Sequence, residues 1–183
     1  MCTGYDAVIS YRSHDFRDCL HDSALRPYAD GIYTLGVRML RDRHLAEDLV
    51  QDTFLKILRG SAPYTGDGSL AGWLYRIGYN GALDMLRRRR ETPPDATAPE
   101  TWTVATEASA ESSVMAMVLA EALDTAIQEL PETLRAAFVL RDVEELSTSE
   151  VAQVLGIGES AVKMRLARAR EQMRVSLGDR LWN

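Results

Sequence analysis

Apolar residues recur at three- and four-residue spacings along most of the chain, and this period is typical of amphipathic α-helices. No segment shows the strict alternation of apolar and polar residues that indicates a half-buried strand. The expected helices cover residues 23–41, 45–59, 69–90, 115–129, 132–142, 148–154 and 159–176. The pattern therefore predicts an all-α protein.

The helical pattern stops in the middle of the chain, at residues 91–113. This segment, ETPPDATAPETWTVATEASAESS, has three prolines, five acidic residues and no basic residue. Such a composition buries too little apolar surface to fold alone and is typical of a flexible linker. We therefore predict two small helical domains, at residues 23–90 and 114–178, joined by a flexible acidic linker and preceded by an N-terminal arm at residues 1–22.

The size and composition of the chain suit a globular protein. Its 183 residues, 46% of them hydrophobic, can form one medium domain or two small ones. No apolar run approaches the ~20 residues that span a bilayer, and no signal-peptide pattern begins the chain, so we expect a cytoplasmic protein without membrane insertion. Cys2 and Cys19 form no C-x-x-C pair, so no metal site, disulfide or cofactor is predicted, although a redox role for Cys19 stays open.

The net charge of −6 is unusual for a protein that binds DNA, but its distribution is informative. Residues 91–134 hold nine acidic and no basic side chains, while each flank is slightly positive. A chain with so little overall attraction for phosphate should bind DNA weakly by itself. If it reads DNA, a partner must bring it there.

Residues 146–170, LSTSEVAQVLGIGESAVKMRLARAR, carry the signals of two helices joined by a tight turn. Ser147 and Glu150 have capping-box spacing, so each side chain can accept from a free backbone N–H group at the start of the first helix. Gly156 suits the left-handed conformation that ends a helix. Val162 and Leu166 continue the apolar face of the second helix. This order predicts a helix-turn-helix.

The second of these helices would lie in the DNA major groove. Its first residues would meet base edges, and later basic residues would lie nearer phosphates. Five of the eight basic residues in 135–183 fall between positions 163 and 174. The alternative is a helical hairpin with its charges on a solvated face. The predicted base contacts are Glu159, Ser160 and Lys163, and the predicted phosphate contacts are Arg165, Arg168 and Arg170.

The predicted helix at residues 70–90 is apolar on most of its circumference and polar along one stripe. On a helical wheel the stripe spans about 80° and ends in a basic run at residues 87–90. Asn can pair with a base edge, Arg with phosphate, and an aromatic ring can stack on an unpaired base. The alternative is a solvated stripe whose basic end complements the helix dipole. The stripe consists of Trp73, Arg76, Asn80, Asp84 and Arg87.

Three segments in this order carry a resemblance to a known family. They are AEDLVQDTFLKIL (46–58), GWLYRIGYNGALDMLRRRR (72–90) and the segment LPETLRAAFVLRDVEELSTSEVAQVLGIGESAVKMRLARAREQMR (130–174). Together they resemble the extracytoplasmic-function (ECF) sigma factors of the sigma-70 family. The resemblance covers about 25–90 and 114–176. It implies a region 2 helical bundle, a region 4 helix-turn-helix, and an alternative sigma factor that has no catalytic activity.

The resemblance also implies partners and roles. The chain would bind bacterial core RNA polymerase, recognise the −10 and −35 promoter elements and help to open the promoter. The helix at 46–58 would bind the β′ clamp, and its outward face places apolar Leu55 among polar residues that include Lys56 and Arg59. An exposed leucine is common by itself. The implied polymerase contacts are Asp48, Gln51, Asp52 and Leu55.

The loop at residues 61–69 and the helix after it would bind the −10 element and trap a flipped base. The implied contacts there are Trp73, Arg76, Asn80, Asp84, Arg87 and Arg88, although Trp73 is expected mainly in the core. The C-terminal domain would bind the −35 element as a duplex and dock on the polymerase β flap. Promoter elements nearly two helical turns apart are separated by roughly 60–70 Å, which an extended 91–113 linker can span.

Some positions depart from the family pattern. The family commonly has Phe at Leu70, and Pro, Gly, Thr and Ser where this chain has Gly158, Ser160, Ala161 and Met164. These differences leave the preferred −35 sequence undefined. An anti-sigma factor is a possible partner whose identity the sequence does not reveal.

Three other kinds of protein compete with the sigma-factor interpretation. A stand-alone helix-turn-helix regulator would account for residues 147–174 but not for the two earlier segments. A decoy that occupies polymerase without initiating transcription would differ only in activity. An enzyme fits poorly because the carboxylates are scattered, the three histidines lie within residues 14–44, and no Gly-rich phosphate loop is present.

Overall fold

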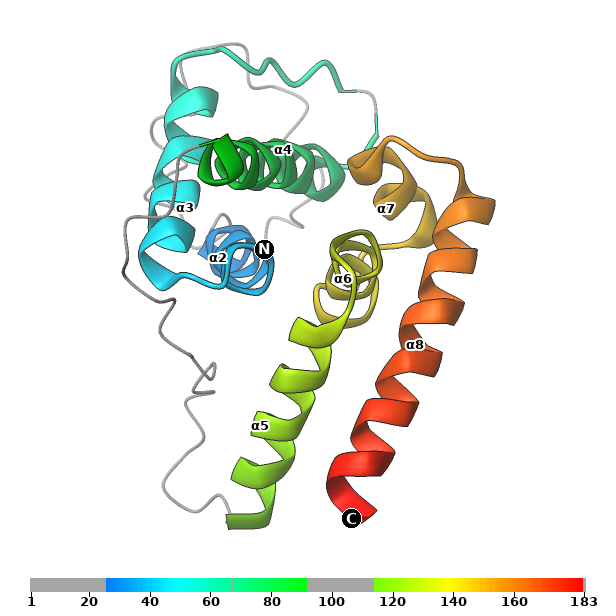
Figure 1. The fold of residues 1–183 in the computed structure, drawn as a ribbon. Coiled ribbons are helices and arrows are strands. Elements are labelled where there is room, and N and C mark those ends of the chain that lie inside the picture. The colour runs from blue at the N-terminus through cyan, green and yellow to red at the C-terminus, as the bar shows by residue number, and fades with distance from the viewer. Residues whose placement is uncertain (1–25, 67, 92–113, 183) are drawn as a thin grey trace, which may run out of the picture.

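The computed structural model describes residues 26–66, 68–91 and 114–182, and every regular element within them is helical. The predicted all-α fold is confirmed, and the helices lie within a few residues of the expected bounds, except that the last one continues to Trp182 (Figure 1). The predicted arm at 1–22 and nearly all of the predicted linker lie outside the described residues. The elements are α2 (Arg26–Leu40), α3 (Arg43–Leu58), α4 (Leu70–Glu91), α5 (Val114–Glu129), α6 (Glu132–Phe138), the π-helix η2 (Val139–Val143), α7 (Thr148–Leu155) and α8 (Glu159–Trp182).

The first group consists of α2, α3 and α4, and these three helices pack closely against one another. A Cβ atom added at Gly78 would lie 3.1 Å from Ile32 of α2, and one at Gly81 would lie 2.8 Å from Leu49 of α3. Glycine costs a helix interior about 1 kcal/mol relative to alanine. Here that cost is offset because the bare backbone of α4 lets both neighbouring helices approach closely.

The second group contains α5 to α8 and includes the predicted helix-turn-helix. Ser147 and Glu150 form the capping box, and Gly156 ends α7 in the left-handed region at φ 65°. Val162 and Leu166 of α8 are buried against the core. In Figure 1, α5 and α8 lie side by side and run in opposite directions. The local signals predicted from the sequence thus produce the expected turn.

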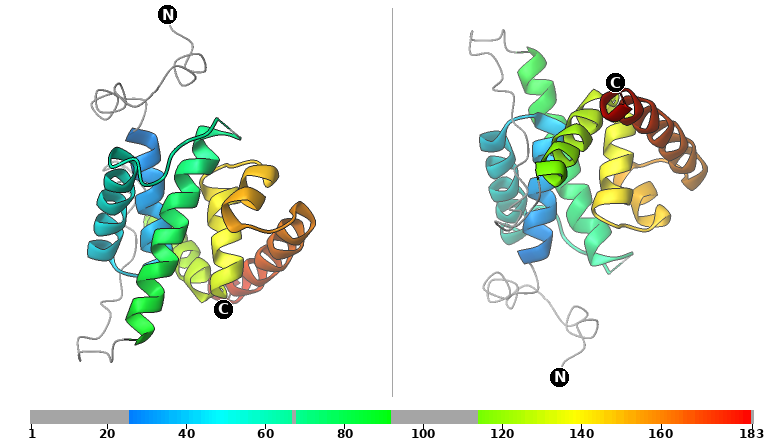
Figure 2. Two further views of the ribbon diagram at one scale, coloured as in Figure 1. Left: turned by 90° about the horizontal axis from the view of Figure 1, so that it is seen from above. Right: turned by 90° about the horizontal axis from the view of Figure 1, so that it is seen from below.

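The two groups pack against each other and share one hydrophobic core, which the sequence did not predict. Ile32 and Tyr75 of the first group belong to the same buried cluster as Val151 and Val162 of the second. α4 packs against α2 and α3 and also against α7, and α2 contacts α6 directly (Figure 2). The predicted boundary between the two domains therefore does not separate two hydrophobic cores in this structure.

Buried charges reinforce the junction between the groups. Arg38 of α2 and Asp124 of α5 form an ion pair at 2.7 Å with side chains only 12% and 7% exposed. The buried guanidinium of Arg135 donates to four backbone carbonyl oxygens, three near the end of α5 and one in α2. Burial lowers the pKa of Arg135 to about 10, so the side chain is charged at neutral pH.

Replacing Glu145 with Gly should stabilise the fold by about 0.5–1 kcal/mol. Glu145 is exposed and has φ 56°, a conformation that costs a side chain with a Cβ but is easily adopted by glycine. Urea unfolding measures the difference. The control is Glu145→Ala, which removes the same carboxylate but keeps the Cβ, and which should give no stabilisation. Equal effects of the two substitutions would contradict a backbone origin.

Candidate nucleic-acid interface

The polar stripe of α4 faces outward, while the other sides of the helix are packed up to Leu86. Arg76, Asn80, Arg87 and Arg88 are exposed, and Asp84 is half-buried. The Oδ1 atom of Asp84 lies 3.4 Å from Nη2 of Arg87, so the two charges partly neutralise each other. The stripe therefore presents one amide and several guanidinium groups along a single face of a rigid helix, which is a suitable surface for a nucleic-acid strand.

Trp73, the predicted aromatic member of the stripe, is half-buried and mainly supports the structure. It packs against Ile57 and Leu74, and its ring lies 5.3 Å from that of Tyr64 with an interplanar angle of 52°. The Tyr64 hydroxyl donates to the carbonyl of Gly68 at 2.7 Å. The aromatic pair therefore fixes the loop at 61–69 beside α4.

Tyr64 is a site residue that sequence reasoning missed. The other residues of its loop are small or polar, and no periodic pattern there predicts whether the Tyr64 side chain is buried or exposed. The available signal was an aromatic residue in the loop directly before a tryptophan-bearing helix. In the structure Tyr64 joins the predicted −10 surface by shaping the loop.

The start of α8 presents the predicted base-contacting residues to solvent. Glu159, Ser160 and Lys163 are exposed, as is Arg168, whereas Arg165 is half-buried. Their common exposure on the first turns of one helix fits the entry of that helix into a groove.

Arg170 differs from its expected position near phosphates. Its guanidinium donates to both carboxylate oxygens of Asp142, at 2.6 and 3.0 Å, and this hydrogen bonding raises the pKa of Arg170. A bidentate pair of this kind holds the side chain in place. Arg170 therefore braces α8 against η2, and Lys163, Arg165 and Arg168 remain as the cations of the surface.

The α3 helix carries the predicted polymerase-contacting face. Leu55 is 41% exposed in the centre of this face, while Leu49 and Thr53 on the opposite side are fully covered. Val50 and Phe54 are half-buried at the flanks of this face. The predicted outward orientation is confirmed for the exposed residues Asp48, Gln51, Asp52, Leu55, Lys56 and Arg59.

A carboxylate at the helix-turn-helix connects the two groups. Glu150 accepts from both the backbone N–H and the hydroxyl of Ser147, at 2.8 and 2.6 Å, and it also hydrogen-bonds Ser69 just before α4. Partial burial acts to raise the pKa of Glu150, but these hydrogen bonds outweigh burial and hold the pKa below its ordinary value. The capping group is therefore ionised at neutral pH.

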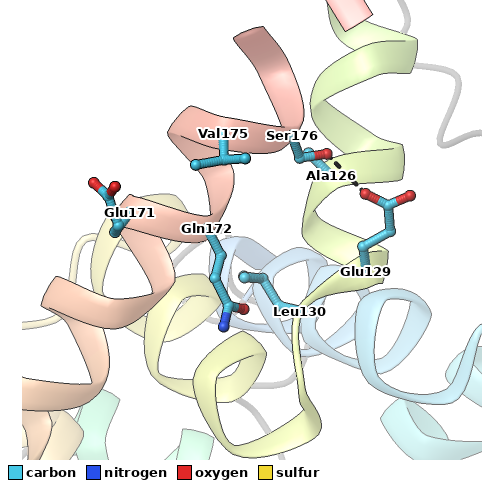
Figure 3. A pocket seen from close by; sticks show the side chains of 7 residues that line it. All are labelled: Ala126, Glu129, Leu130, Glu171, Gln172, Val175 and Ser176. Carbon is cyan, nitrogen blue, oxygen red and sulfur yellow. Dashed lines mark hydrogen bonds between the residues drawn. The ribbon is translucent and has the colours of Figure 1, made fainter. Parts of the chain in front are cut away.

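A groove runs between α5 and α8 on the far part of the second group. Ala126, Leu130 and Val175 line it, and Ser176 donates to Glu129 across it at 2.7 Å (Figure 3). The groove is open and holds no cluster of groups suited to catalysis. Within the described ranges, no group of His, Cys, Asp and Glu side chains could hold a metal ion, and no helix is long and apolar enough to cross a membrane.

Two family models match this chain, one in each group of helices. The model of Sigma-70 region 2 matches residues 24–92, which contain α2 to α4, and the model of Sigma-70, region 4 matches residues 120–173, which contain the helix-turn-helix. The region 2 match precedes the region 4 match along the chain, which is the order predicted from the sequence. The class of protein is therefore a sigma-70-type factor with both DNA-reading regions.

Relatives narrow this class. The chain is 31% identical over 160 residues to the ECF RNA polymerase sigma factor SigW of Bacillus subtilis, covering 83% of this chain and 86% of that protein. It is 34% identical over 167 residues to the RNA polymerase sigma factor CarQ of Myxococcus xanthus, covering 90% and 94%. It is also 37% identical over 155 residues to the ECF sigma factor SigE of Mycolicibacterium smegmatis, covering 84% of this chain but only 60% of that protein. The chain belongs to the ECF sigma factors.

Solved structures share the fold. The sigma factor RpoE, in complex with the anti-sigma factor NepR from Bartonella quintana, has a TM-score of 0.71 at 22% identity over 89% of this chain and 96% of that one. CnrH in complex with the cytosolic domain of CnrY has a TM-score of 0.61 at 23% identity over 93% and 92%. These structures show the fold, while the family models and the relatives confirm the family predicted from the sequence and do not favour a stand-alone regulator. The roles of individual residues stay predictions.

Proposed function

We propose that this protein acts as an alternative sigma factor in the bacterial cytoplasm, without catalytic activity of its own. It binds core RNA polymerase, recognises −10 and −35 promoter elements and helps to open the promoter. The observation that supports this best is the polar stripe of α4, because the helix is packed on its other sides up to Leu86 while Arg76, Asn80, Asp84, Arg87 and Arg88 are open to a ligand. The proposed units are a region 2 domain at 23–90 and a region 4 domain at 114–178, with an arm at 1–22 and a linker at 91–113.

Each surface takes one part of the reaction. The α4 stripe holds the non-template strand of the −10 element, with Trp73 and Tyr64 supporting the loop that receives a flipped base. Unstacking a base costs a few kcal/mol, so the protein must supply compensating contacts. The start of α8 reads the −35 duplex through Glu159, Ser160 and Lys163.

Two further surfaces bind polymerase. The β′ clamp contacts the α3 face around Leu55, together with Asp48, Gln51 and Asp52. The β flap docks on the second group, where the groove between α5 and α8 offers an apolar binding surface. An anti-sigma factor is a further proposed partner, supported by the solved structures of RpoE and CnrH in complexes.

DNA binding with and without polymerase tests this function against the stand-alone regulator. Promoter fragments should be retained by the protein only weakly alone and much more strongly with core polymerase, because the chain carries a net charge of −6. Tight, sequence-specific binding by the protein alone, unchanged by polymerase, would support a stand-alone regulator instead.

Asn80→Ala should impair promoter opening while leaving the affinity for polymerase unchanged. Asn80 is exposed in the middle of the stripe and lies on a different helix from the proposed clamp contacts. Loss of one base contact of about 1–3 kcal/mol should reduce open complexes roughly 5- to 150-fold. Permanganate footprinting measures opening, and polymerase titration measures affinity. Equal losses in the two measurements would refute the role of the stripe.

A further inference from the structure

One of the hydrogen bonds between the two groups joins α4 to the residue that follows η2. The Tyr75 hydroxyl of α4 donates to Oε2 of Glu144 at 2.5 Å, across 69 residues of sequence. Burial and this bond both raise the pKa of Tyr75, so the phenol keeps its proton. Burial also raises the pKa of Glu144, whereas the Tyr75 bond and the charge of Arg38 act to lower it. The bond therefore compensates part of the cost of covering this carboxylate.

Gly31 of α2 makes room for this pair. A Cβ atom at Gly31 would overlap both the Tyr75 hydroxyl and the Glu144 carboxylate. The hydrogen bond thus lies against bare backbone, with α2, α4 and the end of η2 meeting at one point.

The helix-turn-helix covers the entrance to the −10 surface in this arrangement. The amide oxygen of Gln153, on α7, would lie 2.9 Å from a Cβ at Gly68 and 3.6 Å from one at Gly72, and Glu150 hydrogen-bonds Ser69. The first helix of the helix-turn-helix therefore rests on the end of the 61–69 loop and the first turn of α4.

The packed arrangement also brings the two DNA-reading helices into one small body. A compact chain of 183 residues has a radius of gyration of about 16 Å. The two promoter elements lie roughly 60–70 Å apart, as nearly two turns of duplex separate them. One packed body cannot reach both, so the second group must move away from the first.

We propose that Gly31, Tyr75 and Glu144 form a latch that holds the free protein closed, and that this latch must open before both promoter elements are bound. The closed latch is a property of the chain alone. The requirement that it open rests on the proposed sigma-factor function.

Energy transfer between two dyes tests the latch without polymerase or DNA. Cysteines introduced by His44→Cys on α3 and Arg174→Cys on α8 carry the dyes, in a full-length chain with Cys2→Ser and Cys19→Ser. Both labelled positions are exposed. Wild-type protein should show mainly high transfer. Tyr75→Phe should raise the low-transfer population about tenfold or more, since a hydrogen bond to a charged group is lost.

Tyr33→Phe is the matched control. Its hydroxyl accepts from Nε of Arg43 at 3.0 Å, and both residues belong to the first group. This variant should leave the transfer unchanged. Wild-type transfer in folded Tyr75→Phe, or equal changes in the two variants, would overturn the latch.

Glu144→Ala tests the latch independently by removing the acceptor of the hydrogen bond. Because this side chain is half-buried, its removal leaves the hydrophobic core intact. It should open the protein as Tyr75→Phe does, and the double variant should open it little further because both remove the same bond. Additive effects would overturn a shared latch. If the variants open but no variant supports transcription, the latch stands and the proposed function fails.

Discussion

Arg135→Met should lower the free energy of unfolding by about 3–5 kcal/mol. The Arg135 guanidinium donates to the carbonyls of Ile127, Gln128 and Leu130 at the end of α5, where Ile127 also accepts from the backbone N–H of Leu130 and Gln128 also accepts from Arg41. It also donates to the Arg38 carbonyl of α2. Methionine fills similar space but leaves four carbonyl oxygens without this donor in a buried site.

Chemical denaturation of the full chain measures this effect. Arg135→Lys is the matched variant, because it keeps the charge at the negative end of the α5 dipole but lacks the planar fork. It should be less destabilising than Arg135→Met. A change below about 1 kcal/mol in Arg135→Met would show that the buried guanidinium does not hold α5 to α2.

Leu55→Asp should weaken binding to core polymerase about 30-fold or more. Leu55 is the apolar centre of an otherwise polar exposed face on α3, which is the usual place of a residue that dominates an interface. A carboxylate there would lose the apolar contact and would also have to be desolvated on binding. Because the residue is exposed in the free protein, the fold should be unaffected.

Fluorescence titration with core polymerase measures the affinity, and thermal unfolding checks the fold. Leu55→Met keeps an apolar side chain of similar volume and should bind nearly as well as the wild type. Unchanged affinity in Leu55→Asp would place the polymerase contact elsewhere.

The helices and their ends were predictable because their signals are local. The capping box of Ser147 and Glu150, and Gly156 after α7, act within one turn of the chain. The outward face of α3 followed from helical periodicity alone.

The packing of the two groups was not predictable, because its contacts join distant segments. Glu144 and Arg135 look like ordinary surface charges in the sequence, yet each donates to or accepts from a residue of the other group. Tyr75 looks like a core residue, and nothing in its neighbourhood indicates a carboxylate partner. Arg170 was predicted near phosphates as a basic residue of the second helix of the helix-turn-helix, and its pairing with Asp142, 28 residues away, is not a local signal. Such pairings depend on the tertiary arrangement and not on local pattern.

Transcription by reconstituted polymerase tests the central claim most directly. Sigma-free bacterial core polymerase is mixed with this protein and a library of genomic promoter fragments, and the transcripts are sequenced. A sigma factor with these surfaces should yield transcripts from a subset of promoters that share −10 and −35 sequences, and Asn80→Ala should reduce them. If the folded protein binds polymerase but gives no transcript from any promoter, it is a decoy and does not initiate transcription.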